Sequence, residues 1–141
     1  MCLEKAKQIT PEKDITCYKA CVYDIYNDEY YSPFQASRYV LGRTKYVRRT
    51  QAKFPFEPTI YGGAFHSFAN KDDAIKYCEL FNRRMHNPYN SYLVVIECSI
   101  PKSSVYVYEG VFTYYTDVII RVNVPSYASQ RIKPVKVVYQ K

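Results

Sequence analysis

One segment of the chain, residues 70 to 85, repeats its apolar residues at helical spacing, and this constrains the fold more than any other feature of the sequence. The repeating residues are Ala74, Ile75, Cys78, Phe81 and Met85. Asn70 is a favourable N-cap, and Asp72 and Asp73 suit the positive end of the helix dipole. Because Asn87-Pro88 cannot continue a helix, the pattern predicts one principal helix over residues 71–85.

The rest of the chain is rich in β-branched and aromatic residues bounded by Pro or Gly, which is typical of strands. Such runs occupy residues 15–23, 64–68, 92–100, 105–108, 118–124 and 132–139, with shorter ones between 30 and 47. One helix with about seven strands predicts an α+β fold with a mainly antiparallel sheet. The core is expected to include Cys17, Cys21, Ile75, Cys78, Phe81, Val94, Ile96 and Val137.

The chain has 141 residues, a length that suits one domain and buries roughly two thirds of the surface of the unfolded chain. Residues 1–14 are charged and lack apolar periodicity, so we expect a flexible N-terminal arm followed by a single domain over 15–141. The longest apolar stretches fall far short of the ~20 residues of a membrane span. No apolar segment follows Met1 as in a signal peptide, so a cytoplasmic protein without membrane contact is expected.

The five cysteines have no CxxC pair and no Cys/His cluster at zinc spacing. We therefore expect reduced thiols, buried except at Cys2, and no metal or cofactor. Cys17 and Cys21 lie four residues apart on an expected strand, roughly 13 Å, which is too far for a disulfide. The sequence has no nucleophile elbow, phosphate loop or dinucleotide fingerprint, so no catalytic residue is assigned.

Positive charge is concentrated in one segment of this chain of net charge +7. Between Tyr30 and Phe56 there is no acidic residue, whereas six residues are basic: Arg38, Arg43, Lys45, Arg48, Arg49 and Lys53. Basic residues interleaved with aromatic rings are typical of sites for phosphate or single-stranded nucleic acid. A solvated strand face or a surface that docks an acidic protein gives the same pattern, so these alternatives stay open.

A second candidate site lies where a Gly-Gly turn precedes the predicted helix. If a cleft exists, it should lie beside this turn, because glycine permits close backbone approach and a helix N-terminus favours anions. The candidate residues are Lys19, Tyr61, Gly62, Gly63, His66 and Ser67. The alternative is a semi-buried His66 that holds the turn, and Asp72 and Asp73 would oppose an anion there. The hypothesis requires the side chains of His66 and Lys19 to lie on the same face of the sheet.

Several segments resemble a family of small uncharacterised proteins from gut Bacteroidales and their phages. They are Cys17-Tyr-Lys19, Leu41-Gly-Arg-Thr44, Gly62-Gly-Ala-Phe-His-Ser-Phe68, Asp73-Ala-Ile-Lys-Tyr77, Ile100-Pro-Lys-Ser103, Tyr106 to Gly110 and Tyr127-Ala-Ser-Gln-Arg-Ile132. The resemblance covers about 120 residues and carries no known activity. It implies a phage or prophage accessory protein in a bacterial cytoplasm.

A more remote similarity is to the ADP-ribosyltransferase fold. Lys19 matches an early strand position that bears Arg or His there, His66-Ser67-Phe68 matches a Ser-rich strand, and Ile100-Pro-Lys-Ser103 matches a Pro-Lys segment. Where that family has its catalytic Glu, this chain has Ser129-Gln-Arg131. The resemblance thus implies nucleotide binding with doubtful transfer chemistry.

The sequence favours a non-enzymatic binding module whose partner is anionic: a nucleic acid, a nucleotide or an acidic host protein. A degenerate ADP-ribosyltransferase-like enzyme is the alternative.

Overall fold

The computed structural model describes residues 3–33, 37–47, 64–84 and 91–140. Within these residues it has one helix and ten strands, so the expected α+β class with a mainly antiparallel sheet is confirmed, while the expected count of about seven strands was too low. The elements are β1 (Glu4–Ile9), β2 (Ile15–Asp24), β3 (Glu29–Tyr31), β4 (Arg38–Tyr39), β5 (Lys45–Tyr46), β6 (Phe65–Phe68), α1 (Lys71–Arg84), β7 (Ser91–Ile100), β8 (Val107–Tyr115), β9 (Arg121–Ser129) and β10 (Arg131–Tyr139).

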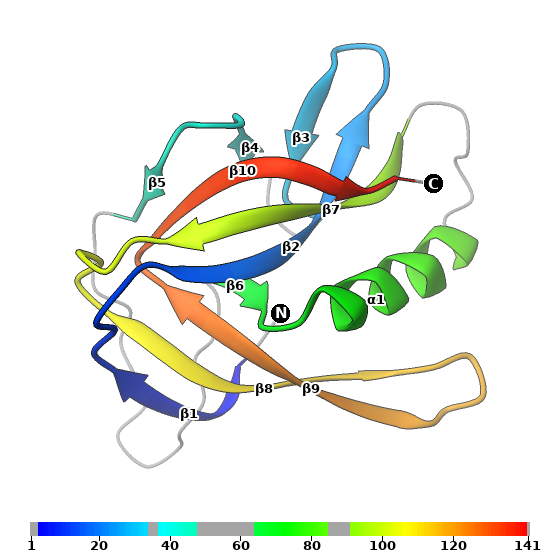
Figure 1. Cartoon of the computed structure of the whole chain (residues 1–141). Coiled ribbons are helices and arrows are strands. Elements are labelled where there is room, and N and C mark those ends of the chain that lie inside the picture. The colour runs from blue at the N-terminus through cyan, green and yellow to red at the C-terminus, as the bar shows by residue number, and fades with distance from the viewer. Residues whose placement is uncertain (1–2, 34–36, 48–63, 85–90, 141) are drawn as a thin grey trace.

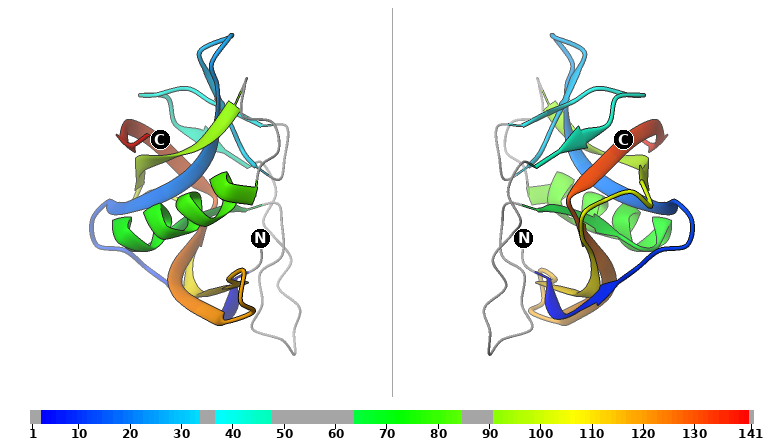
Figure 2. Two further views of the ribbon diagram at one scale, coloured as in Figure 1. Left: turned by 90° about the vertical axis from the view of Figure 1, so that its right-hand side faces the viewer. Right: turned by 90° about the vertical axis from the view of Figure 1, so that its left-hand side faces the viewer.

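The strands form one sheet in the order β1-β8-β9-β6-β2-β7-β10-β5; in addition, β3 pairs with β2, and β4 pairs with β3. At its centre, β2 and β7 pair without interruption from Ile15↔Ile100 to Asp24↔Ser91. The sheet bends so that β10, β7 and β2 lie on one side of α1 and the β8–β9 hairpin on the other (Figure 1). The β2–β3 hairpin projects from the end of the molecule that lies opposite the β8–β9 hairpin (Figure 2).

The strict alternation of β2 and β7 separates two faces of the sheet. The helix face packs against α1 and carries Ala20, Phe68, Leu93, Val95, Phe112 and Val124. The opposite face carries Cys17, Cys21, Phe65, Val94, Ile96, Cys98 and Ile132. Which face a side chain occupies therefore decides which groups it can meet.

The predicted helix is confirmed as α1 over Lys71–Arg84, and the last predicted position, 85, lies outside the described residues. Its first turn holds Asp72 and Asp73, and Asn70 Nδ2 donates to the Asp73 carboxylate at 3.1 Å. Most of the expected core is buried, but Ile75, Phe81 and Val137 are only partly so. Tyr77 and Leu80, which the expected core omitted, are buried in their place.

The N-terminal segment that we expected to be a flexible arm forms edge strand β1 instead. β1 pairs with β8 from Glu4↔Val111 to Ile9↔Val107, with one irregularity between Glu4 and Lys7. Leu3 is fully buried. The prediction failed because charged residues on the exposed side of an edge strand hide its periodicity.

Gly110 on β8 makes this pairing possible, and replacing it should be costly. A Cβ at this position would lie 2.5 Å from the Glu4 carbonyl oxygen and 2.9 Å from Leu3 Cγ. We expect Gly110→Ala to lower the free energy of unfolding by about 1–3 kcal/mol, because the backbone of β1 must move away. Urea denaturation measures this loss. Gly42→Ala is the control for the loss of a glycine, since open space surrounds Gly42 and only its positive φ of 84° opposes a side chain. Equal stability of wild type and Gly110→Ala would contradict this packing.

Candidate anion site

A lysine occupies the opposite face of the sheet, where apolar residues and thiols surround it. Lys19 is only 8% exposed, between Cys17 and Cys21 on the same face of β2. Its Nζ donates to the carbonyl oxygen of His66 at 2.7 Å and lies 5.4 Å from the centre of the Tyr39 ring. Burial disfavours the charge, but the neighbouring Tyr39 and the thiols of Cys21 and Cys98 outweigh it, so the pKa of Lys19 lies above its ordinary value. Lys19 therefore carries a buried positive charge.

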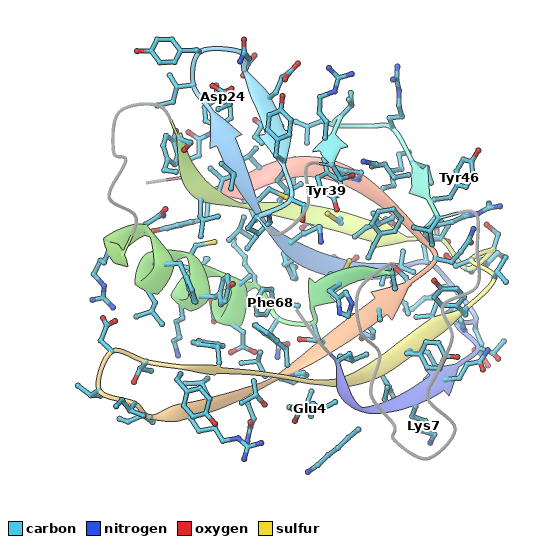
Figure 3. The ribbon with its side chains drawn as sticks, turned by 180° about the vertical axis from the view of Figure 1, so that it is seen from behind. Glu4, Lys7, Asp24, Tyr39, Tyr46 and Phe68 are labelled. Carbon is cyan, nitrogen blue, oxygen red and sulfur yellow. The ribbon has the colours of Figure 1, made fainter. Side chains whose placement is uncertain are left out.

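A second ammonium group reaches the same tyrosine. Lys45 Nζ lies 4.8 Å from the centre of the Tyr39 ring, donates to the Arg38 carbonyl oxygen at 2.6 Å and also donates to the Ser37 hydroxyl. Burial lowers the pKa of Lys45, and the positive charges of Lys19 and Arg38 lower it further. Figure 3 shows Tyr39 over the central strands when the molecule is seen from behind.

No carboxylate balances these two charges among the residues that the structure describes. The ion pairs of those residues join Arg38 to Glu29, Arg121 to Glu4 and Lys136 to Glu97. Two lysines thus converge on one tyrosine without an acidic partner in the described part of the chain. Buried charges are normally paired, so this excess of positive charge favours a bound anion.

Beside the lysines, four tyrosines form a ladder across four neighbouring strands. Tyr39 of β4 pairs with Tyr30 of β3, Tyr30 with Tyr23 of β2, and Tyr23 with Tyr92 of β7. The Tyr23 ring centre lies 5.1 Å from that of Tyr30 and 5.6 Å from that of Tyr92. Tyr39 is buried, whereas the other three are half-buried and keep part of each ring accessible. We name Lys19, Lys45 and these four tyrosines the Lys–Tyr cluster.

The structure separates the two residues that the cleft hypothesis required on one face. Tyr18 and Phe68 are cross-strand partners and share the helix face. Side chains alternate along each strand, so the imidazole of His66 lies on the side of Phe68, while Lys19 lies on the opposite face. Only the backbone carbonyl of His66 reaches Lys19. The imidazole and the ammonium therefore do not line one cleft.

Ser67 does lie on the lysine side, next to Cys17. Its hydroxyl is buried and has no hydrogen bond of normal geometry within the described residues. The Cys17 thiol has Cys98, Ser67 and Lys19 beside it, and these outweigh its burial, so the pKa of Cys17 lies below its ordinary value. Burial raises the pKa of the neighbouring Cys21 to about 12.

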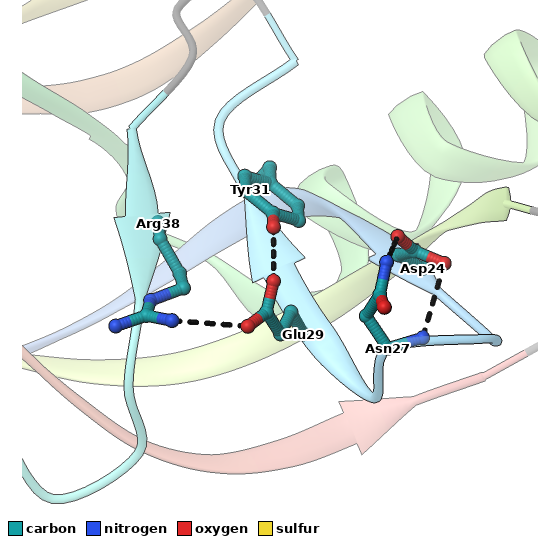
Figure 4. Close-up of polar contacts among 5 residues, drawn as sticks. All are labelled: Asp24, Asn27, Glu29, Tyr31 and Arg38. Atoms are coloured by element: carbon teal, nitrogen blue, oxygen red, sulfur yellow. Dashed lines mark hydrogen bonds and ion pairs between the residues drawn. The ribbon is translucent and has the colours of Figure 1, made fainter.

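The described half of the basic segment does not form an open cationic patch. Arg38 Nη1 lies 2.9 Å from Glu29 Oε1, and Tyr31 donates its hydroxyl proton to the other oxygen of Glu29 (Figure 4). Nearby, Asp24 accepts hydrogen bonds from Asn27 and closes the β2–β3 turn (Figure 4).

The other predicted basic residues have different surroundings. Lys45 turns inward, whereas Arg43 is exposed. Of the other predicted residues, Arg48, Arg49, Lys53, Tyr61, Gly62 and Gly63 lie outside the described residues.

The position that the ADP-ribosyltransferase resemblance assigns to a catalytic Glu serves the protein's own hydrogen bonds. Gln130 accepts from the Val105 backbone N–H at 3.0 Å and donates to the Val47 carbonyl at 3.1 Å. The Ser129 hydroxyl donates to the Arg131 carbonyl at 2.9 Å. Gln130 thus links the turn between β9 and β10 to the backbone at Val47 and Val105.

The expected free thiols are confirmed at four positions: Cys17, Cys21, Cys78 and Cys98 are buried and unpaired by disulfides, while Cys2 lies outside the described residues. The described ranges contain no cluster of three or more His, Cys, Asp or Glu that could hold a metal ion. They also contain no helix long and apolar enough to cross a membrane.

Sequence reasoning selected Lys19, Lys45 and Ser67 and noted Tyr39 among the aromatic residues of the basic segment, but it assigned no site role to Tyr23, Tyr30 and Tyr92. Tyr23, Tyr30 and Tyr39 come from strands that follow one another in the chain, whereas Tyr92 joins the ladder through a pairing with β7, which is distant in the sequence. A usable signal was present for Lys19, since alternation from Cys17 to Tyr23 places it on one face with two cysteines. Because cysteine is among the residues most often buried, a lysine that shares a strand face with two cysteines is expected to be buried as well.

Comparison of the chain with protein-family models, with curated proteins and with solved structures found no match. The two resemblances noted in the sequence therefore stay predictions.

Proposed function

We propose that the protein is a binding module for a nucleotide-like ligand, which carries both a phosphate group and an aromatic base. The observation that carries this proposal is the convergence of Lys19 and Lys45 on Tyr39 without a described carboxylate. A phosphate would neutralise the excess charge through charge-assisted hydrogen bonds, which are stronger than neutral ones.

The tyrosine ladder supports the aromatic half of the ligand. Tyr30, Tyr23 and Tyr92 extend from Tyr39 in one row and are half-buried, so their rings offer stacking surface next to the positive charge. Stacking of a base on an aromatic side chain contributes about 1–3 kcal/mol. A free mononucleotide or the end of a single strand fits this arrangement, whereas a duplex could not reach a lysine that is nine-tenths buried.

Replacing Lys19 should weaken binding without unfolding the protein. We expect Lys19→Met to weaken binding of ADP at least tenfold, which corresponds to about 1.4 kcal/mol. Met has similar length and no charge, but it cannot replace the hydrogen bond to the His66 carbonyl, so the free energy of unfolding should fall by about 1–3 kcal/mol while the chain stays folded. Isothermal titration calorimetry with ADP, adenosine, inorganic phosphate and a short single-stranded oligonucleotide measures the change, and thermal unfolding reports stability.

Lys133→Met is the matched control, because Lys133 is exposed on β10 and lies outside the Lys–Tyr cluster. It should bind as wild type does. Equal ADP affinity of wild type and Lys19→Met would contradict the proposal, as would binding of adenosine as tight as that of ADP. Adding NAD⁺ to the panel tests the transferase alternative, since consumption of NAD⁺ would identify an enzyme.

A further inference from the structure

The turn between β8 and β9 exposes three consecutive large aliphatic side chains. Val118, Ile119 and Ile120 are 73%, 81% and 59% exposed. The sequence predicted a strand from residue 118, but β9 begins only at Arg121, and these residues form the tip of the hairpin instead. A run of exposed apolar residues costs solubility, so it indicates a contact surface.

The backbone of this exposed tip is strained at Ile119. Ile119 has a φ of 59°, a conformation that β-branched residues rarely adopt. Hydrogen bonds fix it: Ile119 N–H donates to the Thr116 carbonyl at 3.0 Å, and Ile120 N–H to the Thr116 hydroxyl at 3.1 Å. Strain held by the surrounding structure is found preferentially at functional sites.

A hollow of about 530 Å³ lies directly beside the tip, between α1 and the hairpin. Leu80, Tyr114 and Val122 give it an apolar floor. Its rim carries two basic and two acidic residues, Lys76, Arg83, Glu79 and Asp117. Val118 belongs both to the exposed tip and to the wall of the hollow, so the projection and the hollow are neighbours in one chain.

We propose that two copies of this chain associate through the β8–β9 tip, each inserting Ile119 and Ile120 into the hollow of the other. The β8–β9 tip and the hollow are adjacent in each copy. A two-fold axis between the two copies can therefore place each tip in the hollow of the other, and the resulting dimer is a closed assembly. The rim is complementary in charge under that axis, since Glu79 of one copy can face Lys76 or Arg83 of the other. This inference is independent of ligand binding.

Analytical ultracentrifugation of the full chain over micromolar concentrations tests the proposal. Wild type should change reversibly from monomer to dimer, and Ile119→Asp should weaken dimerisation at least tenfold. Ile119→Gly should also weaken it while raising the melting temperature, because glycine adopts a positive φ without strain. Ile25→Asp is the control, because Ile25 is an exposed β-branched residue of the distant β2–β3 turn.

A photo-cross-linking side chain at position 119 locates the contact. In a mixture of isotope-labelled and unlabelled copies, cross-links between copies should fall on α1 residues 76–83. A wild-type chain that stays monomeric, a dimer that persists in Ile119→Asp, or monomers that sediment with anionic lipid vesicles through the tip would overturn the proposal.

Discussion

Acidification from pH 7 to pH 4 should lower the free energy of unfolding by about 3 kcal/mol through His66 alone. The imidazole is 7% exposed, and neither ring nitrogen has a hydrogen-bond partner within the described residues. Burial, together with the positive charge of Lys19, lowers the pKa of His66 to about 3. Between pH 6.5 and 3 the unfolded chain therefore binds a proton that the folded protein does not, and stability falls with the pH.

The variant His66→Gln isolates this effect from the titration of the carboxylates. It carries no imidazole, so its stability should fall less steeply below pH 6.5, and the difference between the two curves should approach about 5 kcal/mol below pH 3. Urea denaturation at a series of pH values measures both curves. Parallel curves for wild type and His66→Gln would show that His66 is not held neutral by the fold.

Replacing Phe68 by alanine should lower the free energy of unfolding by about 3–5 kcal/mol. Phe68 is 1% exposed and lies where β6, α1 and β8 meet, with ring centres 5.4 Å from Tyr77 and 5.7 Å from Phe112. Phe68→Ala would leave a cavity under the helix and lose these aromatic contacts. The urea midpoint should fall while the m-value stays constant.

Phe81→Ala is the matched control for Phe68→Ala. Phe81 also contacts the Tyr77 ring, at 4.4 Å, but it is only partly buried, so its loss should be clearly smaller. Equal losses for the two variants would mean that the helix face has no single packing centre at Phe68.

The parts of the fold that local pattern specifies could be predicted from the sequence. The helix is an example, because its apolar spacing, its acidic first turn and Asn70 all lie within one segment. Strand β1 could not be predicted, because its identity depends on pairing with β8 and on the close approach that Gly110 permits. The run from Val118 to Ile120 has strand composition, yet a strained turn exposes it.

The candidate site shows the same division between local and long-range information. Lys19 and His66 could be selected from the sequence as polar residues in strand-like segments, but their faces follow from the register between β2 and β6. The inward turn of Lys45 toward Tyr39 depends on the placement of β5, which pairs with β10, a strand distant in the sequence. In the described part of the basic segment, only Arg43 is left as an exposed cation without an ion pair or an inward contact, because Arg38 pairs with Glu29 and Lys45 turns inward.

The central claim is that the ammonium groups of Lys19 and Lys45 bind a phosphate-bearing ligand. The most direct test is an NMR titration with ADP that follows the side-chain resonances of the lysines. The resonances of Lys19 and Lys45 should shift together and saturate at one dissociation constant, while those of exposed Lys133 stay constant. Resonances of Lys19 and Lys45 that stay constant at saturating ADP, or that shift no more than that of Lys133, would contradict the claim.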